Sequence, residues 1–381
     1  MGKSIIKVLV GQRRVGKSYL MFQIMAHIRK THPIFTIIYI NKELHDFASI
    51  RTSDDLLVYI KKQTHSKNKN CIFIDEIQDI TGFEKALRSL VAQDQFDIYC
   101  TGSNAFLLSG ELATFLSGRY VEIKVYGLSY PEFLVFNDLA DTNDSFMKYL
   151  KYGGLPYLIN LTLDDRIVYD YLRNIYDAIL FKDVVRRFHI RNVSFLERLT
   201  EYCADNVGSL VSANKISGFL KSQKMAISPS VVLNYLSFLC ASFFIIRAPR
   251  SEIKGKKVFE IGEKYYFEDL GLRHSILGYR QSDIGKILEN IVFLHLKIRG
   301  FDVAVGKMGD KEIDFIAESS GERMYVQVAY LIPDNKTHDR EFGNLLLIND
   351  NYRKIVVSMD ETAGGNYKGI EHMNIRKFLA E

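Results

Sequence analysis

Near the start of the chain, an apolar run leads into a glycine-rich loop: Ile5-Ile6-Lys7-Val8-Leu9-Val10-Gly11-Gln12-Arg13-Arg14-Val15-Gly16-Lys17-Ser18. Residues 11–18 match the pattern G-x-x-x-x-G-K-[ST] of a phosphate-binding P-loop. The apolar run predicts a buried strand before the loop, and residues 17–30 predict an amphipathic helix after it. In that setting the backbone N–H groups at the helix start point at a phosphate. The alternative is a simple glycine turn, which does not account for strand, loop and helix occurring in register.

This loop predicts how a nucleotide would be held. Lys17 would reach the β- and γ-phosphates, and Ser18 would ligate Mg²⁺. For Arg13 and Arg14 the motif implies contacts through backbone N–H groups only. We therefore expect the ATP-binding residues of the loop at Gly11, Arg13, Arg14, Val15, Gly16, Lys17, Ser18 and Tyr19.

A second motif, Cys71-Ile72-Phe73-Ile74-Asp75-Glu76, consists of four apolar residues followed by two carboxylates. It predicts a buried strand that delivers Asp75 and Glu76 at its C-terminal end, where ligands bind in open α/β sheets. Asp75 would hold Mg²⁺, directly or through water, and Glu76 would orient or polarise the attacking water. Alone, the motif also fits a solvated strand end. The strand pattern at 34–40 lies between the two motifs and implies an extra strand between the motif strands, which favours hydrolysis over kinase-like transfer.

A third strand pattern, Asp97-Ile98-Tyr99-Cys100-Thr101, ends in Gly102-Ser103-Asn104. Ser103 and Asn104 are candidates for sensing the γ-phosphate, with Thr101 a weaker one, and ordinary turn chemistry remains an equal alternative for each residue. Arg119 is a candidate arginine finger, in cis or on a neighbouring subunit. A solvated arginine before a strand is the competing interpretation. The expected catalytic set is therefore Lys17, Glu76 and Arg119.

The order of apolar patterns predicts the fold class. Strand patterns alternate with helical patterns along the first 126 residues, which predicts βαβ units and a parallel sheet. The strands are expected at 5–10, 34–40, 71–75, 97–101 and 120–125, and the helices at 17–30, 52–63 and 83–93. We expect an α/β chain with a P-loop ATPase core at 1–127, a helical lid at 128–192, a winged-helix domain at 193–275 and a further α/β domain at 284–381.

The winged-helix prediction depends on the order of elements in 193–275. Three helical patterns, near 195–206, after Ser212 and after Ser228, precede two extended runs that flank a basic loop. Lysines here could contact phosphates with little sequence preference and strong salt dependence. Winged helices also serve as protein-contact modules, so both interpretations stay open. The candidate nucleic-acid contacts are Lys221, Lys224, Arg250, Lys254, Lys256 and Lys257.

Further short motifs extend along the chain: Leu128-Ser129-Tyr130-Pro131-Glu132-Phe133, Tyr152-Gly153-Gly154-Leu155-Pro156, Lys182-Asp183-Val184-Val185, Tyr266-Phe267-Glu268-Asp269-Leu270-Gly271-Leu272 and Leu288-Glu289-Asn290. With the two phosphate-site motifs, the Thr101-Gly102-Ser103 strand end and Gly118-Arg119, they resemble the AAA+-like predicted ATPases of bacteria and archaea. The resemblance covers nearly the whole chain. It implies ATP and Mg²⁺ as cofactors and, for the last domain, a restriction-endonuclease-like fold of the PD-(D/E)xK type.

Residues of the last domain allow the implied nuclease site to be tested. Glu289 and Asp314 match a helix Glu and a strand Asp, but the next strand offers Gln327 and Ala329 where a carboxylate and a lysine are wanted. Gln327 is a weaker ligand for a hard cation than a carboxylate. A lysine from elsewhere, such as Lys311 or Lys297, would have to substitute. The candidate site Glu289, Asp314 and Gln327 is therefore expected to be degenerate, in a domain kept for scaffolding or binding.

Composition narrows the class of protein. The chain has 381 residues, 47% hydrophobic and 25% charged, which is typical of a globular protein. It has no apolar run long enough to span a bilayer, no secretory signal pattern and four cysteines without a CxxC pair, so we expect a cytoplasmic protein. The expected function is Mg²⁺-dependent ATP binding and hydrolysis that drives or switches a partner interaction. An ATP-regulated DNA-binding protein or nuclease, and a nucleotide-stabilised scaffold without turnover, are the alternatives. DNA and a protein partner both remain open, and an arginine acting in trans would require an oligomer.

Overall fold

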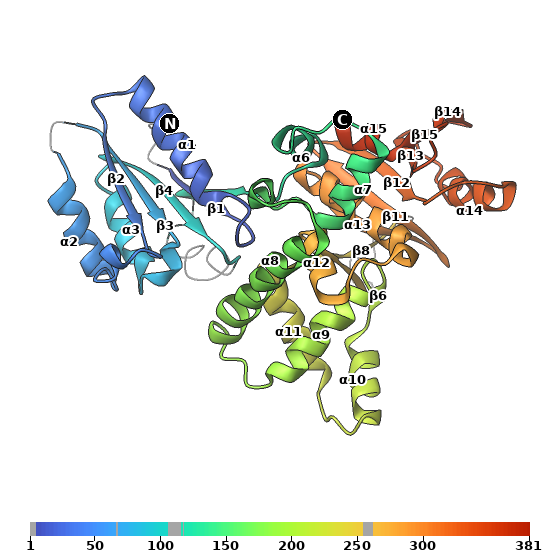
Figure 1. The fold of residues 1–381 in the computed structure, drawn as a ribbon, viewed down its shortest axis with the longest axis horizontal. Coiled ribbons are helices and arrows are strands. Elements are labelled where there is room, and N and C mark those ends of the chain that lie inside the picture. Colours follow the sequence, from blue (N-terminus) through green and yellow to red (C-terminus); the bar gives the residue numbers. More distant parts are fainter. Residues whose placement is uncertain (1–4, 66–67, 106–115, 117, 254–261) are drawn as a thin grey trace. The chain divides into compact units, whose positions relative to one another are not determined.

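The computed structural model describes residues 5–65, 68–105, 116, 118–253 and 262–381 (Figure 1). Its contacts divide the chain into two compact units. The first comprises Met1–Tyr126 together with the short segment Ala241–Phe243, and the second comprises Gly127–Cys240 and Phe244–Glu381.

A five-stranded parallel sheet forms the centre of the first unit. Its strands run in the order β2-β3-β4-β1-β5. They are β1 (Ile6–Val10), β2 (Thr36–Asn41), β3 (Asn70–Asp75), β4 (Phe96–Gly102) and β5 (Tyr120–Lys124). The predicted extra strand between the two motif strands is present, but it is β4. The strand expected at 34–40 is β2, which lies at the edge beside β3, because the chain passes from β3 through a helix and returns to pair β4 with both β3 and β1.

Among the described residues, helices cover both faces of this sheet (Figure 1): α1 (Lys17–Thr31), α2 (Ser53–Gln63) and α3 (Phe83–Val91). Every residue of β3 is buried. Ile72 and Ile74 pack in a core with side chains of α2 and α3, whereas Cys71 and Phe73 pack in a second core with side chains of α1. Burial on both faces explains why this strand is a continuous apolar run rather than an alternating pattern.

A distant segment completes the first core. Phe243 is buried among the residues that α2 and α3 cover, although it lies more than a hundred residues beyond β5. Its carbonyl accepts a hydrogen bond from Gln12 Nε2 at 2.9 Å, and the carbonyl of Ala241 accepts one from the N–H of Ala105 at 2.8 Å. Phe243 adopts a positive φ of 55°, a strained conformation for a bulky residue. Tertiary contacts thus hold this turn in place.

The second unit begins with helices. They are α6 (Tyr130–Phe136), α7 (Asn143–Tyr152), η3 (Pro156–Asn160), α8 (Asp165–Ala178) and the π-helical η4 (Ile179–Arg186), followed later by α12 (Leu270–Leu277) and η5 (Gln281–Asp283). The short helix α12 packs against both α7 and α8. Helix α8 runs directly into η4.

A small three-stranded antiparallel sheet follows, in the order β6-β9-β7. Its strands are β6 (Leu210–Val211), β7 (Ile245–Ala248) and β9 (Glu263–Phe267), and its helices are α9 (Val193–Asp205), α10 (Ala213–Ser222) and α11 (Pro229–Ala241). Along the chain the order is helix, strand, helix, helix, strand, strand. All three predicted helices and both predicted extended runs are therefore observed.

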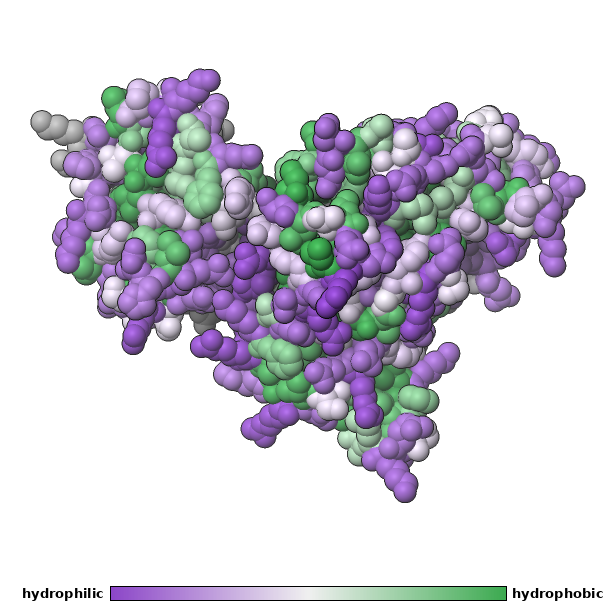
Figure 2. All heavy atoms as spheres, viewed as in Figure 1, coloured by the Kyte–Doolittle hydropathy of each residue, from purple (hydrophilic) through white to green (hydrophobic). Residues whose placement is uncertain are grey.

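A seven-stranded mixed sheet ends the chain, in the order β14-β15-β13-β12-β11-β10-β8. Its strands are β8 (Arg250–Glu252), β10 (Asp302–Met308), β11 (Lys311–Ser319), β12 (Glu322–Val328), β13 (Arg353–Ser358), β14 (Gly364–Tyr367) and β15 (Ile370–Asn374), with helices α13 (Ile284–Ile298), α14 (Asn335–Leu346) and α15 (Ile375–Ala380). Hydrophilic residues cover most of the visible surface, with apolar side chains in small groups (Figure 2). Among the described residues, no helix is both long enough and apolar enough to cross a bilayer.

Candidate nucleotide-binding site

The loop between β1 and α1 has the geometry of a phosphate cradle. A β-carbon at Gly11 would lie 2.1 Å from the carbonyl oxygen of Val125, so only glycine fits there. Gly16 has a φ of 99°, which favours glycine, and no described side chain caps the start of α1. The first N–H groups of α1 are thus left to bind an anion, which the helix dipole also favours.

Lys17 is buried in this loop and bonded to its backbone. The Nζ atom donates to the carbonyl oxygens of Gly11 and Gln12, each at 2.9 Å. A phosphate in the cradle would offer the same ammonium a charged acceptor, which makes a stronger hydrogen bond than a neutral carbonyl. The lysine is therefore placed where the P-loop motif requires it.

The two carboxylates expected at the end of β3 lie beside the loop. Asp75 accepts hydrogen bonds from the hydroxyls of Ser18 and Thr101. Burial raises the pKa of Asp75, and the neighbouring Glu76 carboxylate adds to that increase. A cation at this point would stabilise the ionised form of Asp75.

Glu76 differs from Asp75 in its electrostatics. Burial alone would raise its pKa, but the charges of Lys17 and Arg13 outweigh burial and lower it, so Glu76 remains ionised. Its backbone has a φ of 55° and a ψ of 53°, and its N–H donates to Thr101 Oγ1 at 2.9 Å. Ser103 Oγ donates to Glu76 Oε2 at 3.1 Å. A left-handed backbone conformation and hydrogen bonds from β4 thus position this carboxylate.

The residues present fit Mg²⁺. A serine hydroxyl and a carboxylate in contact are hard oxygen ligands, and Mg²⁺ is usually held by one or two such groups together with substrate phosphates and water. Ser18 and Asp75 would hold the ion, which would neutralise the charge that develops on the β- and γ-phosphates. Among the described residues, no group of three or more His, Cys, Asp or Glu side chains is arranged to hold a metal ion.

The remaining loop residues vary in exposure. Arg13 is nearly buried and pairs with Glu43 at 3.1 Å, whereas Arg14 is exposed and Val15 is buried. Tyr19 follows Ser18 on α1 and is 75% exposed. Asn104 is buried two residues beyond the end of β4. The structure therefore brings Lys17, Ser18, Asp75, Glu76 and Ser103 together.

Arg119 does not join this group within one chain. Its carbonyl accepts a hydrogen bond from the N–H of Ile6, so it lies where β1 and β5 begin. The P-loop follows the other end of β1, roughly 15 Å away at about 3.3 Å per strand residue. Because parallel strands place their C-terminal ends together, the structure does not bring Arg119 to the loop of its own chain, and its role as an arginine finger stays a prediction.

The candidate nuclease residues form a separate polar cluster in the second unit. The N–H of Asp314 donates to Gln327 Oε1 at 3.4 Å, and Gln327 Nε2 donates to Glu341 Oε2 at 3.0 Å. Burial raises the pKa of Asp314 well above its usual range, and the nearby Glu289 carboxylate contributes. Glu289, Asp314 and Gln327 come from three different elements, α13, β11 and β12. The side-chain amide of Gln327, however, is hydrogen-bonded to Glu341.

The cation in this cluster is a lysine that the sequence did not single out. Lys264 of β9 is buried and pairs with Glu289 at 2.9 Å and with Glu312 at 2.8 Å. Tyr266 donates a hydrogen bond to Glu289 at 2.5 Å. Lys297 instead donates to the carbonyl of Phe301 at 3.1 Å. The ammonium of Lys264 therefore neutralises the charge of Glu289, and the hydroxyl of Tyr266 bonds the same carboxylate.

The candidate nucleic-acid contacts fall into three groups. Lys221 and Lys224 are exposed at the end of α10. Arg250 pairs with Glu312 at 3.7 Å and its side chain is only 17% exposed, so it belongs with the Lys264 cluster rather than with solvent-facing bases. Lys254, Lys256 and Lys257 lie outside the described residues.

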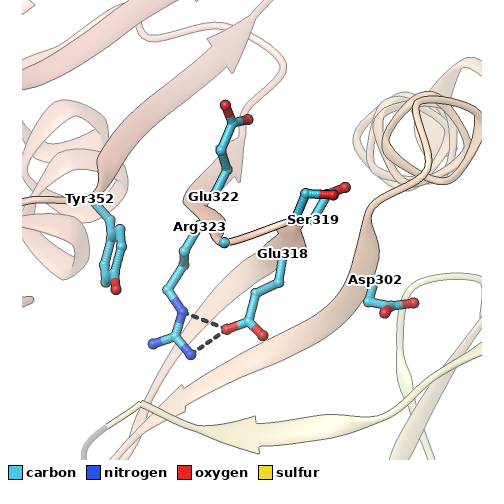
Figure 3. Close-up of a pocket in the computed structure, with 8 residues that line it drawn as sticks. Asp302, Glu318, Ser319, Glu322, Arg323 and Tyr352 are labelled. Atoms are coloured by element: carbon cyan, nitrogen blue, oxygen red, sulfur yellow. Dashed lines mark hydrogen bonds and ion pairs between the residues drawn. The ribbon is translucent and has the colours of Figure 1, made fainter.

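A surface hollow of about 430 Å³ lies at the turn between β11 and β12 (Figure 3). Arg323 reaches across it and pairs with Glu318, while Glu322, Asp302 and Tyr352 also line it. Its arginine is already neutralised by a carboxylate, so it offers no open anion site.

The sequence did not indicate two contributors to these clusters, Gln78 and Lys264. Gln78 lies two residues after Glu76 and contacts it. A polar side chain so close to the Asp-Glu pair is a usable signal, whereas Lys264 lies on a strand that precedes the nuclease-like residues and required knowledge of the tertiary fold. Thr101, the weaker candidate for sensing phosphate, instead bonds both Asp75 and the backbone of Glu76.

Comparison with known proteins places this geometry in a family. A family model described as an AAA domain matches residues 3–134, and one described as a domain of unknown function matches residues 143–283. An uncharacterized protein of Haemophilus influenzae is 37% identical over 382 residues, covering 99% of this chain and 94% of that protein. An uncharacterized protein of Methanocaldococcus jannaschii is 31% identical, covering 93% and 82%.

Among solved structures, the chain is similar to the Aeropyrum pernix Orc1 protein in complex with DNA, with 12% identity and a TM-score of 0.35 over 71% of this chain and 86% of that one. The relatives of 37% and 31% identity extend along almost the whole chain. The chain therefore belongs to the same family as these two proteins, and its residues 3–134 match an AAA domain.

Proposed function

We propose that the first unit binds ATP with Mg²⁺ and hydrolyses it, and that this cycle drives or switches a partner interaction made by the second unit. The observation that carries the proposal is Glu76, an ionised and nearly buried carboxylate placed beside Lys17 and Asp75. Such a group can accept or orient a proton of an attacking water. A phosphate cradle without that carboxylate would support binding alone.

Each residue has a distinct role in this proposal. The N–H groups of the loop and Lys17 bind the β- and γ-phosphates. Ser18 and Asp75 hold Mg²⁺, and Glu76 polarises the attacking water. Ser103 reaches Glu76 Oε2 at 3.1 Å, so it can report on the state of the γ-phosphate through the same carboxylate. Free cysteines throughout the described residues agree with a reducing compartment such as the cytoplasm.

The test is phosphate release from Mg²⁺-ATP, measured with a nucleotide-binding assay on the same samples. Lys17→Ala should weaken nucleotide binding, whereas Glu76→Gln should bind ATP normally and lose turnover by at least about 100-fold. Lys30→Ala, on the exposed end of α1, and Glu322→Gln, in the second unit, are matched controls. Normal hydrolysis by Glu76→Gln would disprove the mechanism. Tight binding without turnover in the wild type would favour a nucleotide-stabilised scaffold.

For the partner, nucleic acid is the second candidate. The order α9, β6, α10, α11, β7, β9, with β9 between β6 and β7, supports a winged helix-turn-helix. Lys221 and Lys224 lie at the end of the helix that precedes α11, the proposed recognition helix. Exposed Ser230, Asn234 and Ser237 on α11 are polar but uncharged, which suits weak sequence preference.

A salt titration of duplex DNA binding, followed by fluorescence anisotropy, tests this candidate. Replacing both Lys221 and Lys224 with alanine should flatten the slope of log K against log salt by about 2, because each phosphate contact contributes about 0.9. Lys336→Ala, exposed on α14, is the control. An unchanged slope would assign the partner surface to protein contacts instead.

We do not extend the proposal to DNA cleavage. Helix α13 with strands β10 to β12, and Glu289 near Asp314, support a restriction-endonuclease-like fold for residues 284–381. The carboxylate of Glu289 already binds Lys264 and Tyr266, and the side chain of Gln327 is hydrogen-bonded to Glu341. We therefore propose that this domain acts as a scaffold or binding surface.

A further inference from the structure

Gln78 lies directly beside the carboxylate that the proposed hydrolysis requires. It belongs to η2 (Ile77–Asp79), the single turn that follows Glu76 at the end of β3. Its amide Nε2 contacts Glu76 Oε2 and lies 3.4 Å from Ser103 Oγ. Ser103 donates to the same Glu76 oxygen at 3.1 Å. Three polar side chains from two neighbouring strand ends therefore meet at one carboxylate oxygen.

The other end of the Gln78 amide is unusual. Its Oε1 is buried and makes no hydrogen bond with any residue that the structure describes. A buried acceptor without a donor costs free energy, and native proteins keep few of them. Such an atom is suited to a ligand that brings its own hydrogen. The partners of the amide nitrogen are a carboxylate and a hydroxyl, so the site suits a polar ligand.

The chemistry of the site identifies a water as that ligand. A carboxylate oxygen of Glu76, which lies beside the Gln78 amide, can accept one hydrogen of a water, and Gln78 Oε1 can accept the other. A water held by both acceptors would direct its lone pair away from them, towards the phosphate in the cradle. Fixing a nucleophile in this way lowers the entropic part of the barrier.

We propose that Gln78 is a positioning residue for hydrolysis, which holds the attacking water together with Glu76 and fixes the Glu76 carboxylate through its amide. This inference rests on the proposed ATPase activity. In the step itself, the water oxygen forms a bond to the γ-phosphorus. The bond from that phosphorus to the bridging oxygen breaks, and its electron pair stays on ADP. The water proton passes to Glu76 and then to solvent, which leaves ADP, inorganic phosphate and a proton.

The first experiment compares Gln78→Leu with the wild type in steady-state Mg²⁺-ATP hydrolysis. Leucine keeps the approximate size of the side chain and removes both polar atoms. The turnover number should fall about 10- to 100-fold, while KM stays within about twofold, because the amide acts on the water and not on the bound nucleotide. Gln93→Leu, at the exposed end of α3, is the control and should match the wild type.

A stability measurement separates positioning from mere support of the fold. Gln78→Leu is therefore also followed by urea unfolding. A positioning residue should lose turnover with little change in the free energy of unfolding, whereas a residue that only supports the fold should lose stability and raise KM together with the loss of turnover.

Binding of ADP with aluminium fluoride supplies a readout that does not depend on turnover. This complex mimics the phosphoryl group in transit with its attacking water. Gln78→Leu should bind ADP as the wild type does but lose at least about tenfold of the tightening that aluminium fluoride brings. Equal loss of affinity for ADP alone would overturn the positioning role.

The outcomes distinguish this inference from the activity on which it rests. A wild type that does not hydrolyse ATP would remove both. Hydrolysis that is lost in Glu76→Gln but unchanged in Gln78→Leu would overturn only the role of Gln78. Loss of turnover with retained ADP binding and loss of the tightening by aluminium fluoride would support it.

Discussion

Thr101 shows how one hydroxyl connects the two functional carboxylates. Its Oγ1 donates to Asp75 and accepts a hydrogen bond from the N–H of Glu76 at 2.9 Å, and the side chain is fully buried. A non-glycine residue in a left-handed conformation costs roughly 1–2 kcal/mol, so Glu76 needs such a bond to stay in place. The single hydroxyl therefore affects both the metal ligand and the residue that polarises water.

We predict that Thr101→Val lowers ATP turnover by about 10- to 100-fold, because it removes one hydrogen bond to a charged group and one to the strained backbone. The apparent Mg²⁺ requirement should rise as well, since Asp75 loses its donor. Steady-state hydrolysis at several Mg²⁺ concentrations measures both effects. Thr101→Ser keeps the hydroxyl and should restore most of the activity. If the valine and serine variants behave alike, the hydroxyl has no such role.

Strand β9 supplies a buried cation, Lys264, to helix α13 and strand β11. Lys264 is 3% exposed and is held by Glu289 of α13 and Glu312 of β11. Burial lowers the pKa of this lysine, but Glu289 and the other carboxylates outweigh burial and raise it above the usual range. The lysine therefore joins the small sheet to α13 and the large sheet through charge.

We predict that Lys264→Met destabilises the protein by roughly 3–5 kcal/mol, because it leaves two carboxylates near each other without a cation. Urea unfolding measures the change. Arg247→Met is the matched control, since Arg247 makes an exposed pair with Glu263 on the same small sheet, and exposed pairs contribute about 0–1 kcal/mol. Adding Glu289→Gln to Lys264→Met should recover part of the loss. Equal effects of the two methionine variants would contradict the prediction.

The sequence predicted these elements unevenly. The P-loop, Asp75 and Glu76 could be predicted from local patterns. A glycine loop before a helix, together with an apolar strand that ends in carboxylates, is specific for a phosphate-binding site. The position of β2 could not be predicted, because the order of strands depends on where each crossover returns. The link between Lys264 and Glu289, and the position of Arg119 far from the loop, depend on tertiary structure. Strands β8, β14 and β15 are too short or too polar to carry a pattern.

Two buried histidines lower the stability of the folded protein at acidic pH. Burial, reinforced by the charge of Arg273, lowers the pKa of His274 to about 3. Burial lowers the pKa of His295 to about 4. Below a pH of about 6.5 an unfolded chain binds protons at these imidazoles that the folded chain does not bind. Stability is therefore lost as pH falls from about 6.5 towards the folded pKa values.

We predict that His274→Gln reduces this acid sensitivity. The wild type should lose about 1.4 kcal/mol per pH unit from His274 once the pH is below about 6. Glutamine does not titrate and keeps a donor for the carbonyl of Leu150, which His274 Nε2 contacts at 3.1 Å. Urea unfolding free energies at pH 7, 6 and 5 give the two slopes. Parallel slopes for wild type and variant would contradict the prediction.

The segment that returns to the first unit has a consequence for how such proteins can be divided and recombined. Phe243 fills the core of the nucleotide-binding unit, and Gln12 of the P-loop is bonded to its carbonyl. A gene fragment that stops at Tyr126 would encode the sheet and the loop but lack this aromatic residue and leave Gln12 without its acceptor. The nucleotide-binding unit therefore cannot be transferred to another protein as one continuous segment of sequence. Its transfer requires three boundaries: one after Tyr126 and one on each side of Ala241–Phe243.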